Sequence, residues 1–251
     1  MLQGKPGFSV GDIFGSNVFN VGIVVGILAT IGFLKRCSTD LLEELVDILF
    51  LSSLISIVLV MFGSASYLVG LALIGIFVFS VYRMTKNGKQ SPSVTNEKAP
   101  TKQMSKKVVI LKIVVGVALV IAAAELTIIS ASNIATTLGV APILIGAKII
   151  ALGTSIPELA LDLTAARRGR IQLAIGDAIG SNMANITLVL GIVLIASPFG
   201  TVDLSIFAQI LPFVLITTLI LWRYLTKGEV SQFGGIALII TCVVFQATLA
   251  M

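Results

Sequence analysis

The stretch Gly11-Asp12-Ile13-Phe14-Gly15-Ser16-Asn17-Val18-Phe19-Asn20 recurs 165 residues later as Gly176-Asp177-Ala178-Ile179-Gly180-Ser181-Asn182-Met183-Ala184-Asn185. The glycines, the aspartate, the serine and both asparagines coincide, and the alignment continues without gaps to Gly26 and Gly191. Chance similarity of glycine-rich apolar helices would not preserve these polar positions. Paired polar motifs in corresponding apolar segments are typical of transporters built from repeats. The stretch therefore predicts a duplicated architecture with a site between the two copies.

The composition around this motif is that of a membrane protein. The 251 residues are 57% hydrophobic and 12% charged, with a mean hydropathy of +1.07. Each apolar segment is long enough to cross about 30 Å of hydrocarbon as a helix, and helices satisfy the backbone there. We predict an all-α polytopic membrane protein with about eight transmembrane helices, at 8–33, 41–62, 65–83, 108–137, 141–165, 171–197, 204–222 and 230–250.

Charge and polarity divide the chain. Of its 17 Lys and Arg residues, only Lys5 is expected on the side of the first residue, and only Lys148 within a span. The positive-inside rule then predicts a multi-pass protein of the cell membrane with both termini outside. Residues 85–107 are polar and basic and predict a flexible cytoplasmic linker. The linker separates the remainder of a first repeat, 1–84 with three spans, from a complete second repeat, 108–251 with five.

The two motif copies are separated by five predicted crossings, an odd number, so they enter the membrane from opposite faces. This predicts an inverted-topology repeat, which suits alternating access. The second copy is preceded by a span containing Gly153-Thr154-Ser155-Ile156-Pro157-Glu158. The repeat offset places the partner of this span before residue 1. We therefore expect most of a ten-helix inverted-repeat fold with the first two helices absent.

The Gly153–Glu158 segment carries chemistry near the middle of a span. Pro157 has no N–H for the carbonyl of Gly153, so we expect a local helix break that frees carbonyl oxygens beside two hydroxyls and a carboxylate. A simple proline kink is the alternative, but Glu158 is costly in a membrane without a partner and thus indicates function. These hard oxygen ligands suit Na⁺ or Ca²⁺.

The repeated motifs supply further oxygen atoms. Each carries an aspartate, a serine and an asparagine at i, i+4 and i+8, so each trio lines one helix face. We predict packing roles for the glycines at 11, 15, 176 and 180, and ligand roles for the serines and asparagines.

These residues resemble the cation/calcium antiporter superfamily, especially the sodium/calcium exchangers, whose repeats resemble G-T-S-x-P-E followed by G-N-x-x-G-S-N-x-x-N/D. The second repeat matches over about 142–191, and the first through its second helix only, over about 4–26. The resemblance implies exchange of Na⁺, or in other branches H⁺, for Ca²⁺ by sliding of two gating helices, here 108–137 and an absent partner. It also implies a cation-binding set, comprising Thr154, Ser155, Glu158, the Ala151 carbonyl, Ser181, Asn185, Ser16 and Asn20.

The chain departs from the family pattern in its charges. The first-repeat glutamate is absent, which leaves one central carboxylate and a site of lower charge. Asp12 and Asp177 replace the commoner asparagine and are expected to line the external and cytoplasmic vestibules. Asn185 is neutral where the potassium-dependent branch resembles Asp, which disfavours potassium dependence.

Three further charged residues have open roles. Lys148 is interpreted as a structural ion-pair partner of Glu125 or Asp12; otherwise its ammonium group would substitute for one bound Na⁺ and change the exchange ratio. Asp162, one turn beyond Glu158, either lines the ion route or pairs with an arginine at 167 or 168. Glu125 either pairs with Lys148 or takes part in gating.

The leading prediction is a secondary antiporter that exchanges Na⁺ for Ca²⁺ by alternating access, with the chain alone either active or inactive because the first two helices are missing. The alternatives are an H⁺/Ca²⁺ antiporter and a non-transporting fragment or split subunit. We expect no enzyme activity, since histidine is absent and no hydrolase constellation occurs. No cofactor is expected beyond the transported Ca²⁺ and Na⁺. The expected partners are the lipid bilayer and a second chain supplying the missing helices; no nucleic acid is expected.

Overall fold

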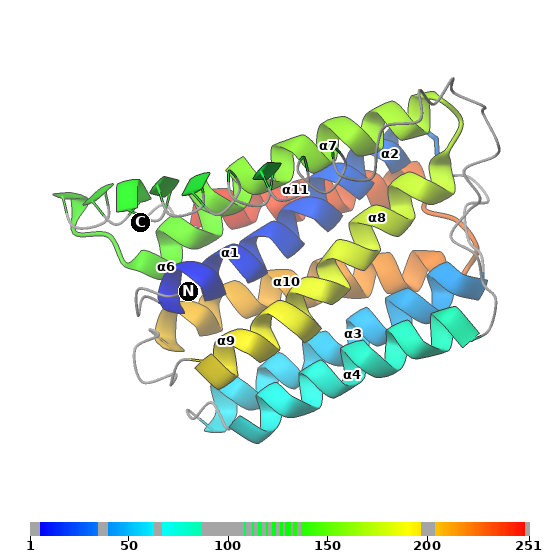
Figure 1. The fold of residues 1–251 in the computed structure, drawn as a ribbon. Helices are drawn as coiled ribbons and strands as arrows, with labels where there is room; N and C mark the ends of the chain where they lie inside the picture. Colours follow the sequence, from blue (N-terminus) through cyan, green and yellow to red (C-terminus); the bar gives the residue numbers. More distant parts are fainter. Residues whose placement is uncertain are drawn as a thin grey trace.

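The computed structural model describes residues 6–34, 40–62, 67–86, 138–196 and 204–248, together with scattered positions between 108 and 137. The described segments form a bundle of long helices (Figure 1). Most of the predicted linker 85–107 lies outside the described residues, and the predicted span 108–137 is described at scattered positions only. The prediction of an all-helical membrane fold is confirmed over the described residues.

Three long helices each contain a π-helical segment. The first consists of α1 (Pro6–Phe19), η1 (Asn20–Val25) and α2 (Gly26–Thr30); the second of α6 (Pro142–Ile145), η2 (Gly146–Ile150) and α7 (Ala151–Arg167); the third of α8 (Ile171–Ala184), η3 (Asn185–Val189) and α9 (Leu190–Ala196). Two of these π segments begin at the repeated asparagines, Asn20 and Asn185. A π segment shifts the hydrogen-bond register of the helix by one residue and is frequent at functional sites.

The expected helix break at Gly153–Glu158 is wrong. α7 continues through Pro157. The departure from α-helical pairing lies before the start of α7, in η2 (Gly146–Ile150). A proline removes only the N–H of one residue, and a helix packed among others can absorb that loss.

Four more helices complete the described bundle: α3 (Asp40–Phe62), α4 (Tyr67–Lys86), α10 (Leu204–Leu225) and α11 (Gln232–Thr248). By length and apolar composition, five described helices can cross a membrane: Gly7–Thr30, Tyr67–Lys86, Pro142–Arg167, Ile171–Ala196 and Ser205–Leu225. α3 has 23 residues, and α11 is a shorter apolar helix of 17. These helices coincide within a few residues with seven of the predicted spans.

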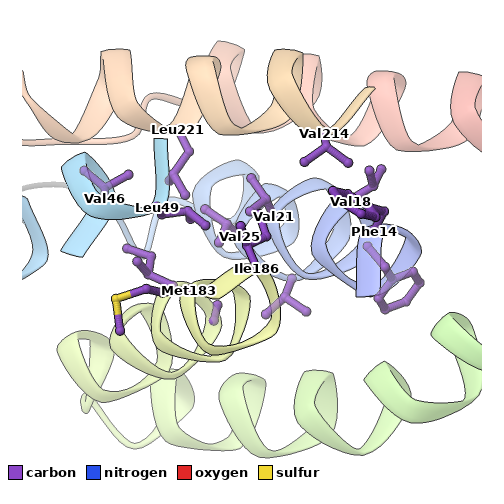
Figure 2. Close-up of a cluster of buried hydrophobic side chains, with 14 of the residues drawn as sticks. Phe14, Val18, Val21, Val25, Val46, Leu49, Met183, Ile186, Val214 and Leu221 are labelled. Atoms are coloured by element: carbon purple, nitrogen blue, oxygen red, sulfur yellow. The ribbon is translucent and has the colours of Figure 1, made fainter. Parts of the chain in front are cut away.

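The helix that carries the first motif forms the centre of the bundle. It is the most buried of the candidate spans, since 83% of its apolar stretch is buried, against 17% for Tyr67–Lys86. Figure 2 shows its Phe14, Val18 and Val21 between α10 on one side and α8 on the other. The Phe14 ring meets Phe207 of α10 edge to face at 4.8 Å between centroids. The apolar flanks of the motif thus fix its polar face in the middle of the protein.

The two repeats are arranged with opposite directions. α1 and α2 run toward the end of the bundle at which α8 begins, whereas α8 and α9 run back toward the end at which α1 begins (Figure 1). α2 crosses α11 at Gly26 and Gly235, and α9 crosses α4 at Gly191 and Gly70. The members of each equivalent pair, Gly26 with Gly191 and Gly70 with Gly235, are again separated by 165 positions. The repeat thus extends through four helices, and its two crossings are equivalent.

The predicted packing role of the motif glycines holds for one copy. A Cβ at Gly11 or Gly15 would collide with the backbone of Ile143 or Ala147. A Cβ at Gly176 would make only an ordinary contact with Leu42, and at Gly180 no other described atom lies within 4 Å. The packing role of Gly180 therefore stays a prediction, since no described residue outside its own helix tests it.

We predict that Gly70→Ala destabilises the protein, because its Cβ would lie 2.9 Å from the Gly191 carbonyl oxygen on α9. Forcing a methyl group into such a contact costs about 1–3 kcal/mol. Gly75→Ala on the same helix is the matched control, since no described atom lies within 4 Å of that position. Thermal unfolding in detergent should show a lower Tm for Gly70→Ala only; equal Tm values would contradict the glycine crossing.

Candidate cation site at the repeat interface

The motif helices α1 and α8 are joined by a reciprocal pair of hydrogen bonds. The Asn17 side-chain amide donates to the Asn182 carbonyl at 3.3 Å, and the Asn182 amide donates to the Asn17 carbonyl at 3.0 Å. Both side chains are buried. A contact of i with j that is matched by j with i is the signature of a two-fold axis. The axis relating the two repeats therefore passes between these residues.

Ser16, Asn20, Ser181 and Asn185, here named the Ser–Asn network, surround this axis. The Asn20 amide donates to the Ser181 hydroxyl at 3.3 Å, and the Asn185 amide donates to the Ser16 hydroxyl at 3.3 Å. The two bonds are equivalent under the repeat offset. The four predicted ligands from the two motifs are therefore brought together, each asparagine facing the serine of the other repeat.

Glu158 breaks this symmetry. The Asn20 amide also donates to Glu158 Oε2 at 2.7 Å, which joins α7 to the network. At the equivalent position the Asn185 amide donates instead to Asn17 Oδ1 at 3.2 Å. The half-buried carboxylate is thus held by a neutral amide of the opposite repeat.

Three buried oxygen atoms in this region have no hydrogen-bond partner among the described residues, and one of them is Asn182 Oδ1. The other two are Asn20 Oδ1 and Ser155 Oγ, whose side chains are both about 1% exposed. Buried polar atoms without a partner are uncommon and call for an explanation. Together with the Glu158 carboxylate they form a set of hard oxygen donors suited to Na⁺ or Ca²⁺. In the described part of the chain, no group of three or more His, Cys, Asp or Glu side chains adds to it.

Thr154 and Ala151 are engaged locally. The Thr154 hydroxyl lies within hydrogen-bond distance of Asp12 Oδ1, at 3.2 Å, and of the Ala151 carbonyl, at 3.2 Å. Thr154 is exposed, and Asp12 is half-buried. This contact lies on the side of Glu158 toward the start of α7, so Asp12 lies at that end of the site.

Asp162 and Asp177 lie at the other end. Asp162 is 3% exposed on α7, and Asp177 is exposed on α8. The only ion pair among the described side chains joins Arg83 and Glu44, so the proposed pairing of Asp162 with an arginine at 167 or 168 is not formed. The alternative interpretation, an acid along the ion route, is consistent with this placement.

Lys148 has a partner that the sequence did not indicate. Its ammonium group donates to the Gln246 carbonyl at 2.7 Å, in the last turn of α11. The ion pair with Asp12 is absent from the described structure, and Glu125 lies outside the described residues. A cation at a helix C-terminus satisfies one of its unpaired carbonyls. The interpretation of Lys148 as a structural residue is retained with this different partner.

The sequence interpretation missed Asn17 and Asn182 as site residues. Both were part of the motif, but only the asparagine three positions later in each copy was assigned a role. The available signal was their retention at the same place in both copies. Since their amides bond to backbone carbonyls, they position the Ser–Asn network.

Comparisons with known proteins identify the family and the fold. A family sequence model described as sodium/calcium exchanger protein matches residues 1–86 and 108–251. The protein CaxA of Alkalimonas amylolytica is 34% identical over 211 residues, which are 80% of this chain and 64%, just under two thirds, of CaxA.

Two solved structures have the same fold. A structure of the sodium-calcium exchanger NCX_Mj soaked with Na⁺ and Sr²⁺ gives a TM-score of 0.67 at 25% identity, over 98% of this chain and 78% of the other. The H⁺/Ca²⁺ exchanger CAX gives 0.78 at 18% identity, over 97% and 69%.

We predict that Asn17 and Asn182 are energetically coupled. Each of Asn17→Ala and Asn182→Ala removes one amide-to-carbonyl bond and should lower the free energy of unfolding by about 0.6–2 kcal/mol, as for hydrogen bonds between membrane helices. Unfolding in mixed micelles measures each variant, and the double-mutant cycle measures how far one bond depends on the other. The control cycle pairs Asn17→Ala with Thr241→Ala, whose hydroxyl bonds within its own helix. Unchanged unfolding free energies in both single variants would show that the reciprocal bonds contribute nothing, and additive losses would show that the two bonds act independently.

Proposed function

This chain belongs to the sodium/calcium exchanger family, a family of helical membrane proteins, and we propose that it exchanges Na⁺ for Ca²⁺ by alternating access. The two inverted repeats support this proposal, since such repeats place the ion site near the middle of the membrane and allow it to open to either side. Cation/Ca²⁺ exchange is the function class of the family, and Na⁺ coupling is our specific proposal.

The observation that carries the proposal is the contact between Glu158 and Asn20 across the repeats. An intramembrane carboxylate needs a compensating partner, and here the partner is a neutral amide rather than a fixed positive charge. A mobile cation can therefore replace the Asn20 amide at the carboxylate. We propose that Ca²⁺ or Na⁺ takes over from the amide at Glu158, while the amide turns to present Oδ1.

The remaining ligands follow from the same geometry. Ser155 Oγ has no hydrogen-bond partner among the described residues, and the hydroxyls at 16 and 181 accept bonds of 3.3 Å from the network amides. The Thr154 hydroxyl and the Ala151 carbonyl would complete the shell on the side of Asp12. Because Na⁺ and Ca²⁺ both take oxygen ligands, one set of donors can serve the two ions in alternation.

H⁺/Ca²⁺ exchange is the second candidate. The observation that favours it is the high structural similarity to CAX, and a desolvated carboxyl group such as Glu158 can also carry a proton. The two candidates differ in one measurable way. Only Na⁺/Ca²⁺ exchange requires a Na⁺ gradient, whereas H⁺/Ca²⁺ exchange responds to a pH gradient alone.

We predict that proteoliposomes containing the chain take up ⁴⁵Ca²⁺ when a Na⁺ gradient is imposed. Glu158→Gln should reduce this uptake by at least about 100-fold, because loss of the carboxylate should cost the bound cation about 3 kcal/mol of binding free energy. Asp47→Asn is the matched control, because Asp47 bonds to Trp222 away from the site. Uptake that persists in Glu158→Gln would refute the site, and uptake driven by a pH gradient alone would favour H⁺ coupling.

Equilibrium binding of ⁴⁵Ca²⁺ to the purified chain separates binding from translocation. Binding that is lost in Glu158→Gln, without uptake by the wild-type chain, would identify a cation-binding subunit that requires a partner chain.

We predict that Lys148→Met lowers stability by about 1 kcal/mol, because the Gln246 carbonyl loses a charged donor. The exchange ratio, measured by reversal potential in liposomes, should not change, since the ammonium group is committed to α11. Lys148→Arg should restore most of the Tm. A changed ratio in Lys148→Met would revive the hypothesis that this ammonium group replaces a bound Na⁺.

A further inference from the structure

Asp162 is a buried acid that the central site does not use. Its side chain is 97% buried, and its Oδ2 atom has no hydrogen-bond donor. It lies one helical turn beyond Glu158 on α7, toward the α7–α8 turn. A buried carboxylate without a donor or a counter-ion is expensive, and the described side chains supply neither. The position therefore calls for an occupant from outside the chain.

Asp177 faces Asp162 from α8. Their carboxyl groups lie within hydrogen-bonding reach of one another, and Glu158 is near enough to interact electrostatically with both. Two carboxylates at such a distance repel strongly unless a proton or a cation lies between them. The two acids differ in solvent exposure, because the Asp177 side chain is exposed at the surface of the bundle, whereas the Asp162 side chain is buried.

We propose that Asp162 and Asp177 form a second cation site that takes Ca²⁺ from the compartment facing the α7–α8 turn, before the ion reaches Glu158. Two carboxylates supply hard oxygen ligands and two negative charges, and water supplies the rest of the shell. With so few protein ligands the site is weak, with a dissociation constant of about 10⁻⁴–10⁻³ M. The transit role rests on the proposed function, whereas the binding of Ca²⁺ does not.

At the opposite end of the central site, Asp12 is the repeat counterpart of Asp177, and its carboxylate accepts a hydrogen bond from the Thr154 hydroxyl at 3.2 Å.

The test measures ⁴⁵Ca²⁺ binding to the purified chain in which Glu158→Gln has disabled the central site. We expect a residual weak component in this variant, and we expect its half-saturating Ca²⁺ concentration to rise at least tenfold on adding either Asp162→Asn or Asp177→Asn. Adding Asp47→Asn, which removes an acid elsewhere, should leave the component unchanged. Asp177 is exposed, so its variant tests the site without disturbing the core.

The second site is overturned if Glu158→Gln has no residual component, or if that component survives both aspartate variants. The central site is judged separately in the same samples. If Glu158→Gln leaves the strong component of wild-type binding intact, the proposed function loses its site while the test of the weak component still stands.

Discussion

The reciprocal hydrogen bonds between Asn17 and Asn182 are the constraint on which the rest of the site depends. Two antiparallel helices in a membrane have no hydrophobic force to set their register, so directed polar bonds and close packing must set it. These amides bond to backbone carbonyls just before each helix changes to π pairing, where the regular hydrogen-bond pattern is interrupted. Once the crossing is fixed, the serine beside each asparagine and the asparagine three positions later necessarily face the other repeat.

The sequence predicted the elements of this arrangement well. Apolar segments must be helical in a membrane, so the spans around Gly26 and Gly191 were recoverable from hydropathy alone. Polar residues retained in two apolar copies, such as Ser16 and Ser181, had to face something other than lipid. The odd number of crossings then gave opposite directions to the two copies, which the antiparallel course of α1 and α8 bears out.

The sequence could not predict which distant backbone atoms these side chains would meet. The charge of Lys148 suggested an acidic partner, but its ammonium group donates to a backbone carbonyl of α11. Every residue has such a carbonyl, so the sequence does not indicate which one a side chain will meet. Pro157 suggested a break in α7, whereas the irregular turn lies upstream in η2, which has no proline. Gly180 matches Gly15 in sequence, but among the described residues a neighbouring backbone packs against Gly15 and none packs against Gly180.

The distribution of charge separates a symmetric part of the site from an asymmetric part. The Ser–Asn network is neutral and equivalent from both sides, so by itself it offers a cation the same environment whichever side is open. Among the described residues the carboxylates are unevenly distributed, since Glu158 and Asp162 both belong to α7 and Asp177 faces them. In a protein that alternates between two openings, a difference in free energy must come from groups that distinguish them. Under the proposed function, the acids along α7 are the described groups that could contribute such a difference.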